Sequence, residues 1–423
     1  MITEIRMENY KVFSKEVRLS LEADMRSRKL SSNVCTKGNF NVLKTISLYG
    51  QNNVGKSCFI KAVNTIRNVM LNKGNDIEPN IFLNNQICAL GISFMYEGEK
   101  YSYDFKFDVI NNEYVYEKFS KISKDMHGNE KENVYYLIDR IKEEYQCMDT
   151  SLLKIFEVIS RSNILIYLIE VDKFDILSNI KEIFTTFASK IEIISMTNIP
   201  IKKTIQLLKN KSYLESKIVN LIKNADLDLD NFYYADSSHL NLIAHSKENS
   251  RPDEDVLNLP ENIEDQIRLV SVHKGKPVPS LLFDSTGTKK IVALSSYIVE
   301  ALEYGKILLI DELDSGLHFK ITRSIVSMFN NDLNDSSQLI FTTHDINLLD
   351  CKKLLRKEQI CFMAKDEEGV FIYSLGDFTA IQGVRDTTDI VERYKKGLLG
   401  ALPDPMLINS LFDIKKNKDV ANE

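Results

Sequence analysis

The chain has 423 residues, of which 43% are hydrophobic and 27% charged, a composition typical of a folded protein with about two or three domains. Its net charge of −6 gives no overall attraction to nucleic acid, because such binding depends on neutralisation of phosphates by Lys and Arg. The six cysteines are scattered without a CxxC pair, and the six histidines show no metal-ligand spacing. The sequence therefore argues against a disulfide framework and against a zinc site.

The N-terminus and the apolar runs bear on localisation. Acidic residues stand where a signal peptide needs an apolar core, and the longest apolar runs fall short of the roughly 20 residues that span a bilayer. We therefore expect a cytoplasmic protein without a membrane partner. A local basic groove could form around Arg26, Arg28 and Lys29, although a solvated charged surface is the simpler interpretation of these residues.

The first part of the chain predicts a strand, a loop and a helix. "ITEIRMENYKVF" alternates apolar and polar residues as a strand does, and "VLKTISLYG" predicts a second strand that ends at Gly50. "KSCFIKAVNTIRNVML" then has the apolar spacing of a helix. From about 88 to 122 aromatic and polar residues alternate, which predicts a β-hairpin or meander.

The remainder predicts a helical segment and a second α/β segment. Residues 134–230 are rich in Ile, Leu, Lys and Glu, and 204–224 has the spacing of one amphipathic helix. Beyond 263, the apolar strands "KILLI", "QLIFTT", "QICFMA" and "VFIYSL" accompany helices predicted at about 289–303 and 318–331. The predicted fold is α/β with a mixed sheet, divided into an N-terminal lobe with a β subdomain, a helical insertion, a C-terminal lobe and a tail: 1–122, 123–262, 263–380 and 381–423.

"GQNNVGKS" fits the phosphate-loop pattern G-x-x-x-x-G-K-[ST], between a predicted strand and a predicted helix. Glycines let backbone N–H groups approach a phosphate, Lys56 supplies a cation for the β- and γ-phosphates, and Ser57 offers a hydroxyl to Mg²⁺. The segment predicts that ATP is bound by Gly50, Gln51, Asn52, Asn53, Val54, Gly55, Lys56, Ser57 and Cys58.

"ILLIDE" is an apolar strand that ends in two acids, at the end of a parallel strand where ligands bind in α/β sheets. We expect Asp311 to hold Mg²⁺, and Glu312 to position and deprotonate the attacking water. A strand that ends in two acids is common, so this interpretation depends on the accompanying phosphate loop.

Lys56 and Asp311 are far apart in the sequence, which is typical of an ATPase core interrupted by other segments, as in the ABC clan. With "GQNNVGKS", "FDSTGTKKIVAL", "LLIDELDSGLH" and "FTTHDINLLD" in this order, the chain resembles ABC-clan ATPases of the SMC, RecF and OLD group. Together with "IRMENYKVF", "LLRKEQICFMAKDEEG" and "RYKKGLLGALPDP", these segments look most similar to prokaryotic defence ATPases of the RloA, AbiL and PARIS (AriA) kind. The middle of the chain, roughly 125–260, carries no such resemblance.

The resemblance implies roles for further residues. Ser285 and Gly287 would form the signature loop that reaches the γ-phosphate of ATP on another protomer, and Asp314 would lie in the loop that crosses to that protomer. His344 would contact the γ-phosphate and sense hydrolysis, so Glu312 and His344 are the predicted catalytic residues. Gln86 is the candidate for the glutamine that senses Mg²⁺, which Ser57 and Asp311 would also bind.

The expected function is a slow ATPase that acts as sensor and scaffold in a bacterial anti-phage system. The resemblance implies a dimer or higher even oligomer, a separately encoded effector such as a Toprim-type or other nuclease, and a phage-encoded trigger. An alternative is a RecF-like or SMC-like repair ATPase that binds DNA directly, although the net charge does not indicate DNA binding. A third is a nucleotide-dependent clamp with negligible turnover, against which the acid pair argues.

Overall fold

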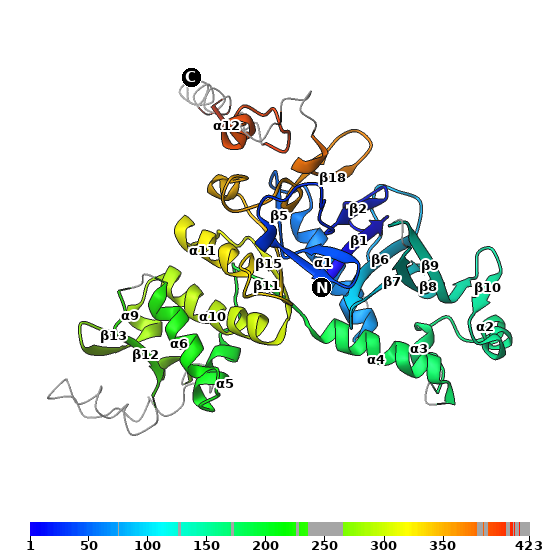
Figure 1. Ribbon diagram of the computed structural model, residues 1–423, viewed down its shortest axis with the longest axis horizontal. Helices are drawn as coiled ribbons and strands as arrows, with labels where there is room; N and C mark the ends of the chain where they lie inside the picture. Colours follow the sequence, from blue (N-terminus) through cyan, green and yellow to red (C-terminus); the bar gives the residue numbers. More distant parts are fainter. Residues whose placement is uncertain are drawn as a thin grey trace, which may run out of the picture.

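The structure is a computed structural model (Figure 1). It describes residues 1–74, 76–125, 128–170, 173–225, 228–235, 265–378, 384, 388–402, 407–408, 410 and 414. The end of the predicted insertion and most of the predicted tail lie outside these residues.

A six-stranded sheet carries the phosphate loop. Its order is β11-β15-β16-β5-β17-β18, and every neighbouring pair is parallel except β17 and β18. The strands are β11 (Ile191–Ser195), β15 (Ile307–Asp311), β16 (Gln338–Thr342), β5 (Thr45–Gly50), β17 (Ile360–Lys365) and β18 (Val370–Ser374). Because the carboxyl ends of parallel strands meet at one edge, the segments that follow β5, β15 and β16 come together there.

Both faces of this sheet are covered. Ile307 and Leu309 of β15 belong to one core, shared with helices α1 (Lys56–Met70) and α4 (Asp175–Ser189). Leu308 and Ile310 belong to a second core, shared with α10 (Thr286–Tyr304) and α11 (Phe319–Phe329). Successive side chains of a strand point to opposite faces, so a strand covered on both sides needs a continuous apolar run. The run "ILLI" meets that need.

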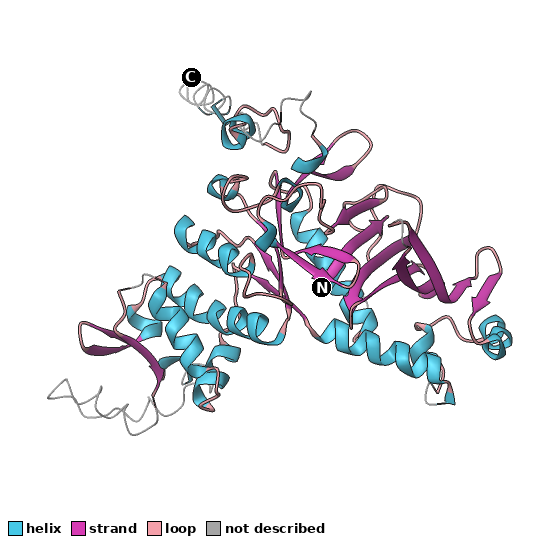
Figure 2. Ribbon diagram, in the orientation of Figure 1, coloured by secondary structure: helices cyan, strands magenta, loops and turns pink. Residues whose placement is uncertain are grey.

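A seven-stranded antiparallel sheet forms the other large layer (Figure 2). Aromatic side chains of its central strands are buried, and the Phe94 ring stacks on Phe187 of α4 with centroids 3.8 Å apart. The meander predicted over 88–122 is confirmed. In spatial order the strands are β10 (Glu144–Cys147), β9 (Glu130–Asp139), β8 (Glu113–Lys124), β7 (Glu99–Asp108), β6 (Ile87–Tyr96), β1 (Ile2–Glu8) and β2 (Val17–Ser20).

The range 123–262, predicted to be helical, contains four complete strands among its described residues: β9, β10, β11 and β12 (Asn231–Tyr234). β9 and β10 extend the antiparallel sheet, and β11 is an edge strand of the phosphate-loop sheet, where Ile191 pairs with Ile307 of β15. The five residues of β11 form a pattern too short to separate a strand from a helix, so pairing with β15 decides the conformation.

The helix predicted over 204–224 is two helices, α5 (Lys202–Lys209) and α6 (Glu215–Asn224). Between them Lys211 has a φ of 47°, a left-handed conformation that interrupts the helical path. Both helices pack against α10. The helices predicted near 289–303 and 318–331 are confirmed as α10 and α11.

The remaining elements are short. They are α2 (Leu153–Val158), α3 (Leu165–Leu168), α9 (Ser280–Phe283), α12 (Ile390–Lys395), the sheet β12 (Asn231–Tyr234), β13 (Leu269–His273) and β14 (Lys276–Pro279), and the hairpin β3 (Val34–Lys37) and β4 (Phe40–Leu43). Single 3₁₀ turns occur at η1 (Ser31–Asn33), η2 (Thr150–Leu152), η5 (Ile346–Leu348), η6 (Lys357–Gln359) and η7 (Leu375–Asp377).

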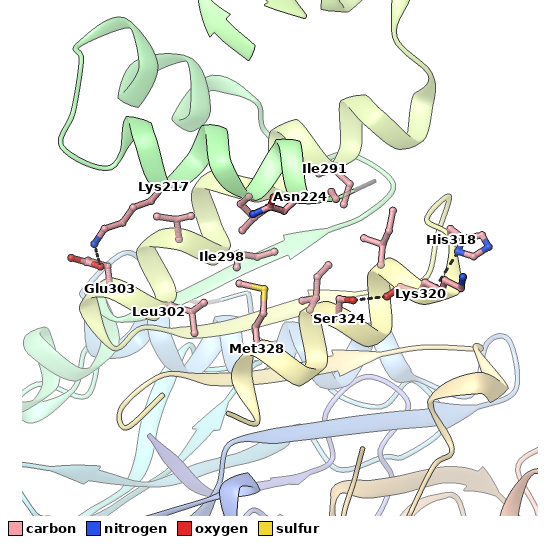
Figure 3. A pocket seen from close by; sticks show the side chains of 15 residues that line it. Lys217, Asn224, Ile291, Ile298, Leu302, Glu303, His318, Lys320, Ser324 and Met328 are labelled. Atoms are coloured by element: carbon pink, nitrogen blue, oxygen red, sulfur yellow. Dashed lines mark hydrogen bonds and ion pairs between the residues drawn. The ribbon is translucent and has the colours of Figure 1, made fainter. Parts of the chain in front are cut away.

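A cavity of about 990 Å³ lies between α6, α10 and α11. Figure 3 shows apolar side chains such as Ile298, Leu302 and Met328 in its wall, with the ion pair of Lys217 and Glu303 at one end. The cavity does not include the phosphate loop. It therefore lies beside the helices that support the candidate site and is separate from the site itself.

Gln338 joins the two large sheets. Its buried side-chain amide accepts a hydrogen bond from the backbone N–H of Ile2 (2.8 Å) and donates to the carbonyls of Ile2 (3.0 Å) and Leu43 (2.8 Å). One side chain at the start of β16 thus satisfies three backbone groups of two other segments.

We predict that Gln338→Ala lowers the free energy of unfolding by about 3 kcal/mol, because it leaves buried backbone groups without partners. Chemical denaturation measures the change. Gln146→Ala on the exposed surface of β10 is the matched control and should have little effect. Equal stability of the two variants would contradict the role assigned to Gln338.

Candidate nucleotide-binding site

Two glycines of the phosphate loop are required by close contacts. A Cβ atom on Gly50 would lie 2.8 Å from the carbonyl oxygen of Met363 on β17 and 2.8 Å from the Val54 side chain. Gly55 precedes α1 with a φ of 116°, and a Cβ there would lie 2.5 Å from the Val12 side chain. Only glycine fits both positions, and the loop is thereby pressed against β17 and the segment after β1.

Lys56 occupies the centre of the loop. Its ammonium donates hydrogen bonds to the carbonyls of Gly50 (2.8 Å) and Gln51 (2.9 Å), and the side chain is buried. Burial lowers the pKa of Lys56, while the nearby carboxylates of Asp311, Glu312 and Asp314 oppose that shift. Asp311 at the end of β15, and Glu312 and Asp314 just after it, therefore lie close enough to influence the Lys56 ammonium.

Thr342, at the end of β16, positions Asp311, the last residue of β15, and Glu312, which follows it. Its hydroxyl donates to Asp311 Oδ1 (2.6 Å) and accepts from the backbone N–H of Glu312 (2.7 Å). Glu312 has a φ of 57°, a conformation that is uncommon for a residue with a side chain. The threonine hydroxyl thus fixes the turn by which the chain leaves β15. Sequence reasoning missed Thr342, whose only signal is a polar residue at the end of an apolar strand.

The loop after Glu312 contacts the segment that carries His344. The Asp314 carboxylate accepts from the His344 backbone N–H at 3.2 Å, and the Leu313 N–H donates to the Thr342 carbonyl at 3.0 Å. Partial desolvation of the imidazole and the nearby Lys56 ammonium lower the pKa of His344, against the effect of the Asp314 and Glu312 carboxylates. The net shift favours the uncharged form of the imidazole. β16 itself ends at Thr342, two residues before His344.

The predicted signature residues begin α10. The Ser285 hydroxyl caps the helix by accepting from the Thr288 N–H (3.1 Å). A Cβ on Gly287 would lie 3.2 Å from the carbonyl of Gly316, and the Lys290 ammonium donates to the Ser315 carbonyl (2.8 Å). The start of α10 is therefore attached to the loop after β15 within the same chain.

Asp284 anchors the segment just before Ser285. Its buried carboxylate accepts from Ser280 Oγ (2.6 Å) and Ser271 Oγ (2.9 Å), and it contacts His273 Nε2 (2.9 Å). Sequence reasoning did not identify this cluster, because its members come from β13, α9 and the following turn. It fixes the residue that directly precedes Ser285, the N-cap of α10.

A segment of the predicted tail touches the phosphate loop. The Gln51 side chain donates to the Leu402 carbonyl, and the hydroxyl of Tyr373 donates to the Leu399 carbonyl (2.6 Å). The Tyr394 ring of α12 packs against Tyr49, which immediately precedes the loop, with centroids 5.9 Å apart. This contact was also missed, since nothing in the sequence near Leu402 indicates proximity to residue 51.

The remaining predicted phosphate-loop residues and Gln86 differ in solvent exposure and in their contacts. Gln51, Asn52, Asn53 and Ser57 are exposed, whereas Val54 is buried and Cys58 half-buried. Gln86 lies just before β6, where its carbonyl accepts from the Val109 N–H (3.1 Å). Among the described residues, its side chain forms no hydrogen bond to the phosphate loop or to Asp311. The proposed Mg²⁺-sensing role of Gln86 therefore gains no support from the contacts of its side chain.

The α/β fold, the phosphate loop and the acidic strand end are the features of a P-loop ATPase domain. A family model described as "AAA domain, putative AbiEii toxin, Type IV TA system" matches residues 46–350, and the chain belongs to this family. The narrower resemblance to the RloA, AbiL and PARIS ATPases stays a prediction. A search of curated proteins found no match. Among the described residues, no helix has the length and apolar character needed to cross a membrane.

Two solved structures are similar to the chain. One is the SMC head domain from Thermotoga maritima, with 10% identity and a TM-score of 0.40, covering 88% of this chain and 98% of that one. The other is an SmcHead bound to the C-winged helix domain of ScpA, with 12% identity, a TM-score of 0.42 and coverage of 90% and 99%.

We predict that Thr342→Val lowers ATP turnover about 10²-fold. The valine cannot make the hydrogen bonds that position Asp311 and Glu312, and a displacement of a catalytic group by about 1 Å lowers the rate by about that factor. Thr45→Val is the matched control, since the Thr45 hydroxyl is also buried and also makes two hydrogen bonds, to Asn330 and Gln359, at the opposite end of the sheet. Steady-state phosphate release measures ATP turnover, and thermal unfolding measures any loss of stability. Equal turnover of both variants, at equal stability, would contradict the role of Thr342.

Proposed function

We propose that the protein binds ATP with Mg²⁺ and hydrolyses it slowly, in sites shared between two protomers, to control a separate effector in a bacterial anti-phage system. The observation that carries the proposal is the cluster at one sheet edge. There the Lys56 ammonium, the acids after β15 and the segment of His344 influence one another electrostatically and through hydrogen bonds.

The donor atoms suit Mg²⁺. This ion prefers oxygen ligands and is usually held by one or two protein groups together with phosphates. The exposed Ser57 hydroxyl at the start of α1 and the half-buried carboxylate of Asp311 are such groups. When bound, the ion would neutralise charge on the phosphates.

Glu312 is the proposed general base. Its carboxylate would accept a proton from the water that attacks the γ-phosphate, and its backbone is fixed by the Thr342 hydroxyl (2.7 Å). A carboxylate in this role is worth about 10²–10⁴ in rate. The imidazole of His344 would orient the γ-phosphate by a hydrogen bond, and Lys56 would stabilise the negative charge of that phosphate.

The N-terminus of α10 is the proposed contact with ATP on the partner protomer. Helix N-termini carry unpaired N–H groups and a positive dipole, which favour phosphate. Ser285 and Gly287 lie in this exposed first turn, and Lys290 links the turn to the loop that contains Asp314. A phosphate bound there would thus affect the position of the loop that contacts His344 in the same chain.

The proposed biological setting draws on the family, whose description names a toxin and a toxin–antitoxin system. The ATPase cluster contains acids, a histidine and a lysine but no cysteine nucleophile or histidine pair. No group of His, Cys, Asp and Glu elsewhere in the described chain is arranged to hold a metal ion. We therefore propose that the damaging activity belongs to another polypeptide, such as a nuclease, released or activated when a phage component is recognised.

We predict that Glu312→Gln lowers ATP turnover by about 10²–10⁴ while leaving ATP affinity within about threefold, because it removes the base and retains the shape of the side chain. Phosphate release and equilibrium binding of a fluorescent ATP analogue measure the two quantities. Glu113→Gln, on the antiparallel sheet, is the matched control and should hydrolyse ATP normally. Normal turnover by Glu312→Gln would show that another group is the base.

The same variant tests the effector. Expressed with its neighbouring genes and purified with ATP, it should give a native mass spectrum of an even-numbered oligomer that carries a neighbour-encoded protein. An oligomer composed of this chain alone would argue against a separately encoded effector, without affecting the assignment of the ATPase residues.

A further inference from the structure

Residues 394–402, which we call the tail segment, dock on the sheet beside the phosphate loop. Tyr394 of α12 and Leu399 are buried in the core that also contains Tyr49. The Tyr394 ring stacks on Phe362 of β17, with centroids 5.6 Å apart. The tail segment is therefore packed against the strand that leads into the phosphate loop and against the neighbouring strand β17.

The turn in the tail segment is held by two tyrosine hydroxyls. Gly400 and Ala401 have φ of 68° and 59°, in the left-handed region that residues with side chains disfavour. A Cβ on Gly400 would lie 2.6 Å from the hydroxyl oxygen of Tyr373, and that hydroxyl donates to the Leu399 carbonyl (2.6 Å). The Tyr394 hydroxyl donates to the Ala401 carbonyl (3.4 Å). The carbonyls on both sides of Gly400 are thus fixed.

The next carbonyl of the tail segment reaches the phosphate loop. The Leu402 carbonyl accepts a hydrogen bond from the side-chain amide of Gln51, and the backbone carbonyl of Gln51 accepts from the Lys56 ammonium (2.9 Å). Among the described residues, this amide makes the one side-chain hydrogen bond of the exposed stretch formed by Gln51, Asn52 and Asn53. The tail segment therefore holds the exposed part of the loop through the residue whose carbonyl meets the loop cation.

This contact bears on the affinity of the loop for phosphates. The two ends of the loop are already fixed, because Gly50 and Gly55 lie against β17 and the segment after β1. The hydrogen bond of Gln51 constrains the exposed stretch between them. A loop that is constrained before its ligand arrives binds more tightly, because less conformational freedom is lost on binding. The hydrogen bonds of Thr342 to the acids of the site, by contrast, do not involve the tail segment.

We propose that the tail segment is a positioning element for nucleotide binding, in which Tyr373 and Tyr394 are positioning residues that act through Gln51. The inference rests on the proposed function, since it assumes that the phosphate loop binds ATP. Hydrolysis itself depends on the groups at the ends of β15 and β16. Loss of docking therefore raises the KM for ATP and changes kcat little, as expected of an interaction made equally in the ground state and the transition state.

The test compares two glycine substitutions within the tail segment. Gly397 and Gly400 have nearly equal φ, 71° and 68°, so alanine imposes the same left-handed strain at both positions. No atom of the described residues lies within 4 Å of a Cβ on Gly397, whereas a Cβ on Gly400 displaces the Tyr373 hydroxyl. Gly400→Ala should weaken binding of a fluorescent ATP analogue about tenfold, and Gly397→Ala should stay within about twofold of wild type.

Tyr373→Phe is a milder change that keeps the test decisive if Gly400→Ala fails to fold. It removes one hydroxyl and retains the ring contact with Phe362, whose centroid lies 5.5 Å away. It should raise the KM for ATP about fivefold. In this background Gly400→Ala should have little further effect, because the nearest remaining atom, Cζ of residue 373, lies 3.8 Å from the added Cβ. Phosphate release at saturating ATP should give a kcat within about twofold of wild type in every variant.

Equal ATP affinity of wild type, Gly400→Ala and Tyr373→Phe would overturn the inference and leave the proposed function intact. Equal losses in Gly397→Ala and Gly400→Ala would also overturn it, because they would reflect backbone strain alone. Tighter binding by Gly400→Ala would show that the tail segment obstructs the loop, which contradicts a positioning role. Wild-type protein that binds no ATP would contradict the proposed function, and this inference with it.

Discussion

The candidate site depends on the parallel pairing of β5, β16 and β15. This pairing places the phosphate loop, the segment of His344 and the two acids at one edge of a sheet, although they are distant in sequence. The same edge brings a buried lysine beside three carboxylates, whose charges counteract the effect of burial on the lysine pKa. These carboxylates would repel an anionic triphosphate. Binding of ATP therefore requires the positive charge of Lys56 and of a divalent cation.

The supporting structure is built from residues that have no direct role with ATP. Thr342 fixes the acids, Asp284 fixes the N-terminus of α10, and Lys290 connects that helix to the loop after β15. Gln338 joins the phosphate-loop sheet to the antiparallel sheet at the other end of β16. These contacts connect the end of β15 and the loop after it, the start of α10 and the β subdomain through buried and half-buried hydrogen bonds. A structural change at the γ-phosphate would therefore be transmitted through a few hydrogen bonds to α10 and to the β subdomain.

Much of this arrangement could be predicted from the sequence, where local pattern and chemistry agree. The strand before Gly50, the helix after Lys56, the aromatic meander and the strand that ends at Asp311 each have long or distinctive patterns. The prediction failed where tertiary contacts decide. β11 is short and becomes a strand by pairing with β15, and the helix predicted over 204–224 breaks at Lys211. The roles of Thr342 and of the Leu402 segment depend on contacts between distant residues, which no single-sequence pattern records.

The central claim is that each ATP is bound between two protomers, and a mixing experiment with two inactive variants tests it most directly. Lys56→Ala removes the loop cation, and Ser285→Arg blocks the N-terminus of α10. Each variant alone should lack ATPase activity. If each site takes its phosphate loop from one protomer and its signature loop from the other, a mixed dimer contains one doubly defective site and one intact site. The account therefore predicts that mixing restores part of the activity. Mixed dimers shown by native mass spectrometry to have formed, yet without any ATP turnover, would contradict it.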